Sequence, residues 1–358
     1  MISSLPLGGL VAFAAALLLL WILSPVARHI GLVDRPRGRK SHARPTPLVG
    51  GIALFVAFAF ALLACDVPLS PYRPLFAGAL ILVVVGVLDD FHELSSRPRF
   101  LAQIFAGLLM TSGAGVVLED FGNLLDPDWV LSLGILAVPA TLFATLGVIN
   151  AVNMSDGLDG LAAALALVAL GALGLLAWTA GAREVTAILW FLAASLLAFL
   201  IFNLRIRGAA LVFMGDAGSM FLGFVLAWLL IQLSQGEDRL LAPVTALWVM
   251  ALPLMDTVSV MLRRIGASRS PFAADREHLH HLLLAAGFSP KRTLALILGL
   301  ALLAAAAGVG GHFLGVPEHW MFFGFLALFF LHYRTVSHSW RAMRFLNRPL
   351  VHPTGAGR

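Results

Sequence analysis

Long apolar runs, separated by shorter polar segments, make up almost the whole chain. Each run is close to the roughly 17 to 25 residues that cross about 30 Å of hydrocarbon as an α-helix. Eleven such runs predict membrane spans at 5–27, 47–65, 74–90, 100–118, 129–149, 158–180, 185–203, 210–233, 240–262, 293–311 and 318–333. The first run is long and lacks a basic segment before it, which favours a retained anchor over a cleaved signal peptide. The pattern predicts an all-α polytopic membrane protein with about eleven transmembrane helices in a single domain, residues 1–358.

The composition agrees with a membrane protein. The chain of 358 residues is 60% hydrophobic and only 12% charged, whereas about a quarter of the residues of a soluble protein are charged. Its single cysteine, Cys65, excludes an intramolecular disulfide and a cysteine-based zinc site.

The basic residues lie almost entirely on one side of the predicted membrane. Eleven spans place successive connections on alternate sides, and 21 of the 24 Lys and Arg residues then fall on one side: 28–46, 91–99, 150–157, 204–209, 263–292 and the tail 334–358. The opposite side holds only Arg73, Arg183 and Arg239. The positive-inside rule therefore predicts that the basic side is cytoplasmic and that the N-terminus faces outward. The net charge of +5 then reflects topology and does not indicate nucleic-acid binding.

Acidic and amide side chains gather at the ends of spans on this basic side. The segment INAVNMSDGLDGLAAA, residues 149–164, contains Asn150, Asn153, Asp156 and Asp159. Further acids stand at other span ends: Asp89, Asp90, Asp216 and Asp256. Ionisable residues at membrane depth are costly and usually face a bundle interior or an aqueous cavity. Each acid could instead cap a helix, but six acids on one side favour a polar site there.

Carboxylates combined with amides favour a hard cation such as Mg²⁺. Mg²⁺ takes oxygen ligands and is typically held by one or two side chains together with substrate phosphates. Asn153 and Asp216 form a sparse set of this kind, which predicts an anionic substrate. Basic groups that can neutralise phosphates stand in the same connections: Lys40, Arg44, Arg205, Arg207, Arg276, His278, His280 and His281.

The run HLHH allows other interpretations. His278 and His281 would share one helix face at a spacing of three residues, as in a zinc site. Zinc requires three or four nitrogen or sulfur ligands, and Cys65 lies near the opposite side of the membrane. The histidines could also be the solvated start of a helix. Anion binding fits best, because the same connection contains Arg276.

Five motifs resemble, in order, those of the polyprenyl-phosphate N-acetylhexosamine-1-phosphate transferases, in the GlcNAc-type branch of glycosyltransferase family 4. They are DRPRGRKSHARPTPLVGG, GVLDD, NAVNMSDGLDGLA, VFMGDAGSMFLG and DREHLHHLLL, and the resemblance covers nearly the whole chain. Members of this family move a sugar 1-phosphate from a UDP-sugar to a membrane polyprenyl phosphate and release UMP. The resemblance therefore implies a phosphotransferase that uses Mg²⁺, with Mn²⁺ as a substitute.

The resemblance also implies roles for single residues. Asp216 corresponds to a metal ligand, with Asn153 beside it. Asp89, Asp90 and Asp156 correspond to catalytic aspartates, and one of the first two is proposed in the family as a base on the lipid phosphate. The substrate-binding positions are Lys40, Asp159, Arg276, His278, His280 and His281.

Two features qualify these roles. The second motif continues as DDFHE, where relatives often have another aspartate or asparagine in place of Glu93. The attacking phosphate has a second pKa of about 6 and is mostly dianionic at neutral pH. A general base is therefore less necessary, and Asp89 could instead position the lipid phosphate or a cation.

The spacing of the histidines indicates the donor. The branch that takes UDP-MurNAc-pentapeptide tends to have three consecutive histidines, whereas HLHH resembles the branch that takes UDP-GlcNAc. Other UDP-N-acetyl sugars, such as GalNAc, FucNAc or QuiNAc, stay open as donors. The resemblance implies undecaprenyl phosphate as acceptor, a multi-pass location in the bacterial cytoplasmic membrane, a role in cell-surface polysaccharide (O-antigen, common antigen or teichoic-type) synthesis and a possible homodimer.

An ion-coupled transporter is an alternative of a different class. It would explain acids near helix ends as a proton or cation relay. Transporters usually place their site near the midplane between repeats, whereas the polar motifs here gather on one side and the chain shows no repeat.

Overall fold

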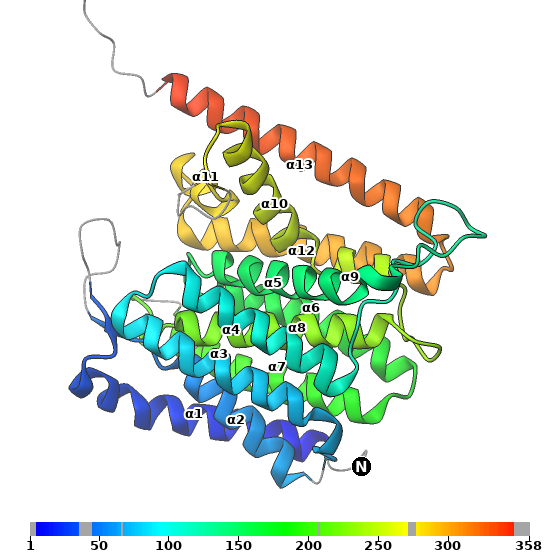
Figure 1. Cartoon of the computed structure of the whole chain (residues 1–358). Coiled ribbons are helices and arrows are strands. Elements are labelled where there is room, and N and C mark those ends of the chain that lie inside the picture. The colour runs from blue at the N-terminus through cyan, green and yellow to red at the C-terminus, as the bar shows by residue number, and fades with distance from the viewer. Residues whose placement is uncertain (1–4, 36–44, 66, 206–207, 271–276, 347–358) are drawn as a thin grey trace, which may run out of the picture.

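The computed structural model describes residues 5–35, 45–65, 67–205, 208–270 and 277–346, and these ranges are mostly helical (Figure 1). The helices are α1 (Leu5–Ile30), α2 (Gly50–Ala64), α3 (Arg73–His92), α4 (Ser96–Leu108), α5 (Ala137–Ser155), α6 (Leu161–Thr179), α7 (Arg183–Asn203), α8 (Gly215–Ser234), α9 (Pro243–Val249), α10 (Ala251–Gly266), α11 (Leu279–Ala285), α12 (Pro290–Phe313) and α13 (Glu318–Leu346). Two short antiparallel strands, β1 (Val33–Asp34) and β2 (Thr46–Pro47), follow α1.

The prediction of an all-α polytopic membrane protein is confirmed. Within the described ranges, seven helical segments are long and apolar enough to cross a membrane, and the bent pair α9–α10 makes up to eight. Helix α2 is apolar but has only 15 residues. Each of the eleven predicted runs overlaps a helix or a helical pair, although the run 129–149 begins before the first helical turn at Gly134.

The predicted span 240–262 is wrong as a single straight helix. The chain breaks at Met250, and α9 and α10 meet at an angle of 82°. Pro253 explains the break, because it has no N–H to donate to the carbonyl of Val249, the last residue of α9. The bend turns α10 out of the bundle, beside α13 (Figure 1).

The predicted connection 150–157 is also wrong in extent, because α5 continues to Ser155. Two of its polar side chains bond back to their own helix: Asn150 Nδ2 donates to Leu146 O at 2.7 Å and Ser155 Oγ to Ala151 O at 2.8 Å. Asn150 and Asn153 therefore project from a helix and not from a loop. Likewise α13 extends beyond the predicted end at 333 to Leu346.

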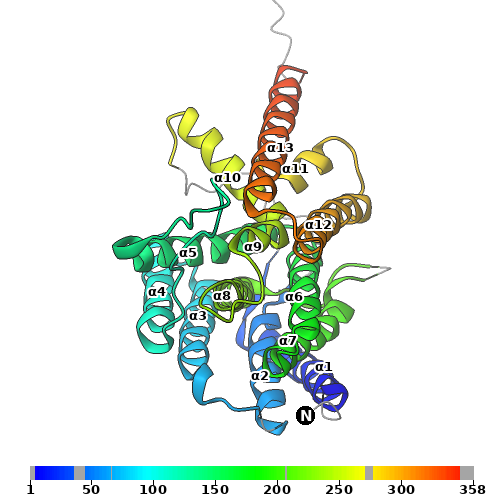
Figure 2. The ribbon, with the colours of Figure 1, turned by 90° about the vertical axis from the view of Figure 1, so that its right-hand side faces the viewer.

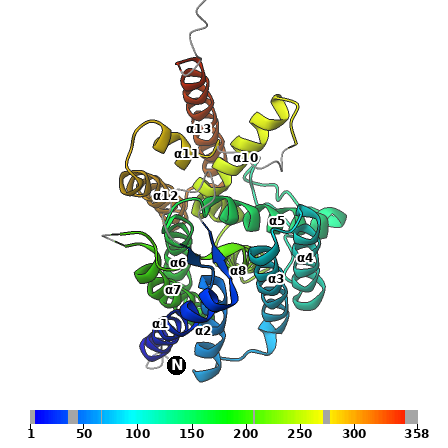
Figure 3. The same cartoon turned by 90° about the vertical axis from the view of Figure 1, so that its left-hand side faces the viewer.

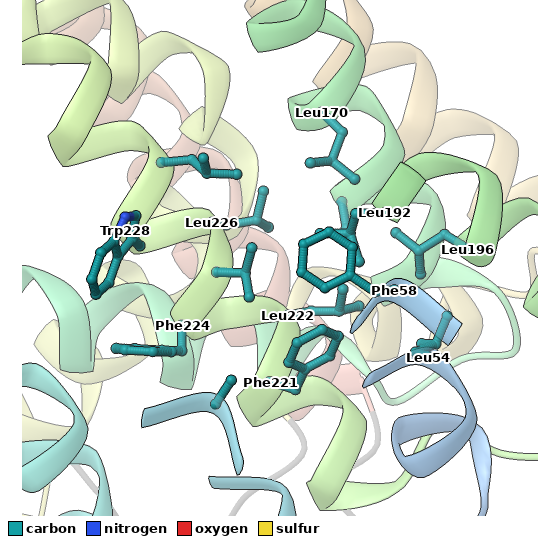
Figure 4. Packing of buried hydrophobic residues seen from close by; sticks show 14 of the residues in the cluster. Leu54, Phe58, Leu170, Leu192, Leu196, Phe221, Leu222, Phe224, Leu226 and Trp228 are labelled. Atoms are coloured by element: carbon teal, nitrogen blue, oxygen red, sulfur yellow. The ribbon is translucent and has the colours of Figure 1, made fainter. Parts of the chain in front are cut away.

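Helix α8 is the centre of the bundle. Figure 2 and Figure 3 show α6, α7 and α1 on one side of it and α3, α4 and α5 on the other. Almost all of its side chains are buried, and Phe221, Phe224 and Trp228 pack against α2 and neighbouring helices (Figure 4). The hydrophobic core therefore surrounds the one helix that begins with the motif GDAGS.

Glycines allow three neighbours to approach α8 closely. A Cβ added at Gly51 of α2 would lie 2.2 Å from the Gly218 nitrogen, and one at Gly86 of α3 would lie 2.3 Å from the Ala217 Cα. A Cβ added at Gly223 of α8 itself would lie 2.5 Å from the Ile149 Cα of α5. Backbone-to-backbone contact of this kind needs residues without a side chain. It brings the ends of α3 and α5 to the start of α8.

Candidate functional site

Three of the predicted site residues meet where α3, α5 and α8 converge. Asp90 is in the last turn of α3, Asn153 in the last turn of α5 and Asp216 in the first turn of α8. The Asn153 Nδ2 atom lies 2.6 Å from the Asp216 Oδ1 atom, and the Asp216 backbone nitrogen lies 2.9 Å from Asp90 Oδ1. The structure thus brings together residues that are 63 and 126 positions apart in the chain.

Asp90 caps the start of α8. Its carboxylate accepts hydrogen bonds from the backbone N–H groups of Asp216 at 2.9 Å and Ala217 at 3.4 Å. Gly215 makes room for it: the φ of this residue is +73°, and a Cβ there would lie 2.5 Å from Asp90 Oδ2. A carboxylate at a helix N-terminus satisfies free N–H groups and the positive end of the helix dipole. Asp90 therefore holds Asp216 in place, as the capping alternative expected.

Asn153 holds the side chain of Asp216. Its amide nitrogen donates to Asp216 Oδ1 at 2.6 Å and to the buried Ser219 Oγ at 2.8 Å. The amide oxygen and nitrogen can exchange places by a 180° rotation. After that rotation Asn153 would present an oxygen, next to a carboxylate oxygen of Asp216, to a cation.

Asp89 is engaged by a different partner. It is only 4% exposed, and Arg99 of α4 lies against it with 3.0 Å between Nη1 and Oδ2. The Leu94 backbone N–H donates to its Oδ1 at 2.7 Å. The guanidinium and the amide together fix the Asp89 carboxylate in position. Sequence reasoning missed Arg99, whose only signal is its place in the basic segment SSRPR.

Glu93 does not join this cluster. Its side chain is exposed, while its backbone has a φ of 50° at the left-handed C-cap of α3 and donates to Asp89 O at 2.8 Å. A non-glycine residue in this conformation is uncommon. The backbone of Glu93 therefore terminates α3, and its carboxylate does not contribute to the cluster that contains Asp89 and Asp90.

The segment after α5 carries Asp156 and Asp159, which are exposed. Surrounding protein atoms, and then the charges of Asp216, Asp90 and Asp159, raise the pKa of Asp156 well above its ordinary value. The buried Asn203 fixes this segment: its Oδ1 accepts from Gly160 N at 2.5 Å and its Nδ2 donates to Val212 O at 2.9 Å. A concentration of negative charge of this kind favours a bound cation.

The histidine run is held by Asp256 of α10. The Asp256 carboxylate lies 2.9 Å from His278 Nδ1 and accepts from the Leu279 backbone N–H at 3.0 Å. His278 is the N-cap of α11, outside the helix, so the predicted face shared by His278 and His281 does not form. The ring of His278 instead lies parallel to that of His280, at 5.9 Å and 10°.

His280 contacts the segment after α5. It is buried, and a Cβ added at Gly157 would lie 2.3 Å from its Nε2 atom. Burial, and then the charges of His281 and His278, lower the pKa of His280 to about 3, so the ring is neutral at pH 7. Its Nε2 atom has no hydrogen-bond partner in the part of the chain that the structure describes. The structure thus joins the third and fifth predicted motifs at Gly157.

Two further residues hold the backbone just before the histidine run. The Glu277 carbonyl accepts from Arg263 Nη2 at 2.7 Å and from Trp340 Nε1 at 2.9 Å. Arg263 belongs to α10 and Trp340 to α13. The long final helix therefore contributes to the position of His278, which its apolar pattern did not indicate.

The residues at the site fit Mg²⁺ better than zinc. Within the described ranges, no three His, Cys, Asp or Glu side chains converge as zinc would need. Mg²⁺ needs fewer protein ligands, because waters and phosphates complete its shell. Asp216 and Asn153, with adjacent oxygen-bearing groups in a region of negative charge, meet that requirement. Lys40, Arg44, Arg207 and Arg276 lie outside the described residues.

Comparisons with known proteins show the family of the chain. The model of the family described as "Glycosyl transferase family 4" matches residues 72–234, which include α3, α5 and the start of α8. Three curated relatives are each called undecaprenyl-phosphate alpha-N-acetylglucosaminyl 1-phosphate transferase. The one from Yersinia pestis is 39% identical over 338 residues, 94% of this chain and 92% of the relative. Those from Haemophilus influenzae and Escherichia coli K12 are each 38% identical, over 94% of this chain and 96% and 92% of the relatives. The chain therefore belongs to glycosyl transferase family 4.

Proposed function

We propose that this protein transfers N-acetylglucosamine 1-phosphate from UDP-GlcNAc to undecaprenyl phosphate, giving undecaprenyl-diphosphate-GlcNAc and UMP. The observation that carries the proposal is the site at the start of α8, where Asp90 and Asn153 hold Asp216 next to Asp156. The relatives that share 38–39% of their residues over nearly their full length are named for this activity. They favour the GlcNAc donor over the other N-acetyl sugars and over a transporter.

The reaction joins two anions, so its barrier consists largely of charge repulsion and alignment. We assign Asp216 and Asn153 to a Mg²⁺ ion, with Mn²⁺ as a possible substitute. Such an ion, when bound, would neutralise phosphate charge and orient the diphosphate. Asp90 keeps Asp216 in position through two backbone N–H groups. The charges of Asp216, Asp90 and Asp159 contribute to the raised pKa of Asp156, and a bound cation would favour its ionised form.

Asp89 is assigned a positioning role and not that of a general base. Its carboxylate is bound by Arg99 and by the Leu94 N–H, and the attacking phosphate is already deprotonated at neutral pH. The pair Asp89–Arg99 instead fixes the end of α3 against α4, one residue before Asp90. It thereby supports the cap on α8.

The histidine run would bind the donor's diphosphate and sugar. His280 lies against Gly157 of the segment after α5, and the rings of His278, which is paired with Asp256, and His281 lie next to that of His280. Lys40, Arg276 and Asp159 are proposed as further substrate contacts on the basis of the family motifs.

We also propose the finer topology. Eleven spans with the site at the cytoplasmic face agree with the 21 basic residues on that side. This orientation would give the site access to UDP-sugars from the cytoplasm and to a polyprenyl phosphate in the bacterial inner membrane. The product would enter cell-surface polysaccharide synthesis, and a homodimer is proposed from the family alone.

A release assay tests the function. The purified protein receives undecaprenyl phosphate, Mg²⁺ and one donor at a time: UDP-GlcNAc, UDP-GalNAc or UDP-MurNAc-pentapeptide. We expect UMP and lipid product from UDP-GlcNAc alone, loss of both in EDTA with recovery on added Mg²⁺, and loss in Asp216→Ala. Turnover that survives EDTA would contradict the metal assignment, and product from another donor would contradict the sugar.

A further inference from the structure

Three arginines line a pocket at the site end of the bundle, apart from the aspartate cluster. Arg28 is in the last turn of α1, Arg35 follows β1 and Arg205 follows α7. They share a cavity of about 1050 Å³, whose other lining residues are Val33, Pro45, Thr46, Gly208, Ala209, Ala210 and Leu211. Among the described residues, the lining contains no aspartate or glutamate, and it contains none of Asp89, Asp90, Asn153, Asp156, Asp216 or the three histidines. Arg205, expected from the sequence to neutralise a substrate phosphate, lines this pocket.

The three guanidinium groups are available to a ligand. All three side chains are exposed, and within the described part of the chain none forms an ion pair or hydrogen bond with another residue. The acid nearest in sequence, Asp34, is not part of the lining and already has a partner. Three unpaired positive charges around one cavity repel each other unless an anion binds between them.

The walls of the pocket are fixed by backbone hydrogen bonds. Leu211 N donates to Phe202 O at 2.8 Å, and Leu48 N donates to Leu32 O at 3.2 Å. Strands β1 and β2 pair in antiparallel register, with Asp34 opposite Thr46. The described walls of the cavity are therefore in place before a ligand binds, which lowers the entropy cost of binding.

The pocket adjoins the lipid-facing surface. Helices α1 and α7 pack side by side, and each ends with apolar residues that the protein leaves exposed: Trp21, Val26 and Ile30 on α1, and Ile201 and Leu204 at the end of α7. Arg28 lies between Val26 and Ile30, and Arg205 comes directly after Leu204. Side chains of this kind lie at the level of the lipid headgroups.

We propose that this pocket binds the phosphate of an anionic membrane lipid, separately from the transferase site. The guanidinium groups match phosphate oxygens in shape and charge, and the exposed apolar ends of α1 and α7 would contact the acyl chains. A soluble phosphate would use the arginines but not this apolar border. The inference does not depend on the transferase reaction.

The amount of lipid that stays bound to the protein measures this binding, and the measurement does not require the transferase reaction. Protein in neutral detergent is mixed with dioleoylphosphatidylglycerol or dioleoylphosphatidylcholine, and bound lipid is counted by native mass spectrometry. The variants are Arg28→Gln, Arg35→Gln, Arg205→Gln and the triple change. The matched control is Arg183→Gln, an exposed arginine at the opposite end of α7.

We expect the wild type and Arg183→Gln to retain phosphatidylglycerol over phosphatidylcholine. Each pocket variant should weaken this retention about fivefold, and the triple variant roughly 100-fold. The single variants test the proposal even if the triple variant does not fold, which gel filtration reports.

Three results would overturn the proposal. Retention by the pocket variants equal to that of the wild type would exclude the pocket. Displacement of phosphatidylglycerol by millimolar inorganic phosphate would show a site for soluble anions. A raised KM for undecaprenyl phosphate in the variants, with phosphatidylglycerol retention unchanged, would place the pocket in the acceptor site.

Discussion

Each carboxylate of the site has a different hydrogen-bond partner, and the partner determines the role that the residue can take. Asp90 accepts backbone N–H groups of α8, Asp89 binds Arg99, and Asp256 binds His278. Asp216, bound by the amide of Asn153, is the one of these four that we assign to the cation. The motifs indicate that these aspartates belong to the site. Only the hydrogen-bond partners in the structure distinguish an aspartate that can bind a metal from one that positions another residue.

Asp90→Ala should lower both stability and activity. The change leaves the N–H groups of Asp216 and Ala217 without acceptors, at a cost of about 1–3 kcal/mol, and frees Asp216 to move. Thermal unfolding in detergent and UMP release measure the two effects. Asp90→Asn is the matched control, because its amide oxygen still accepts one N–H and should preserve most of the stability. Wild-type turnover in Asp90→Ala would contradict the capping role.

Asp256→Asn should reduce kcat/KM for UDP-GlcNAc by roughly 10- to 100-fold, the usual range for a residue that orients another side chain in a site. The amide can still accept from Leu279 N but does not complement the His278 ring as a carboxylate does. Steady-state kinetics over a range of pH measure the effect, and Asp256→Glu should recover part of it. The exposed Asp238→Asn is a control. An unchanged pH profile and unchanged kcat/KM would contradict this positioning role.

The buried, neutral His280 should make the fold less stable in acid. Its pKa is lowered to about 3 in the folded protein and is about 6.5 when unfolded. The unfolded chain therefore takes up the proton first, and the contribution of His280 is complete above pH 6.5 and falls as the pH decreases toward 3. Between pH 7 and pH 5 the loss is about 2 kcal/mol. Unfolding midpoints of the wild type and His280→Gln should converge as the pH decreases. The exposed His29→Gln should follow the wild type, and parallel curves for His280→Gln would contradict the prediction.

At the scale of elements, the contacts of α8 determine whether the site assembles. Asp90, Asn153 and Asp216 meet only because α3 and α5 lie against α8 at glycine contacts. The apolar pattern predicts each helix, since 3.6-residue turns and apolar side chains are local properties. It does not predict which helices touch.

Gly86→Ala should therefore separate α3 from α8. The new methyl group would lie 2.3 Å from the Ala217 Cα, a backbone atom that cannot rotate away. Overpacking of this kind costs about 1–3 kcal/mol, and the same displacement should reduce UMP release. Gly171→Ala, in α6 with no neighbouring atom within 4 Å, is the matched control. It should leave the thermal midpoint unchanged or higher. A midpoint for Gly86→Ala equal to that of Gly171→Ala would contradict the close contact.

At the scale of the whole molecule, the bundle is a membrane protein with polar chemistry at one end. The basic connections and the aspartates, histidines and arginine-lined pocket all lie toward that end. The proposed orientation follows from this asymmetry.

Single cysteines test the orientation. In a Cys65→Ser background, Asp238→Cys between α8 and α9 should react with a membrane-impermeant maleimide on intact cells. Ser95→Cys between α3 and α4 should react only after the membrane is opened. Both positions are exposed, which makes them a matched pair. Labelling of Ser95→Cys in intact cells would show that the protein has the opposite orientation.

The sequence alone determined the helical membrane class, the position of nearly every apolar helix, and the motifs that contain Asp90, Asn153, Asp156 and Asp216. These are local properties, because hydrophobic length and residue type can be read within one segment. The tertiary structure alone decided that Asp90 caps α8, that Arg99 binds Asp89, and that Asp256 holds His278. Each of these contacts joins helix ends whose meeting depends on how the bundle packs. The bend between α9 and α10 was also decided by the tertiary structure. The sequence shows a proline at position 253, where a helix can break, but the packing of α10 against α13 and α5 decides the direction of the bend.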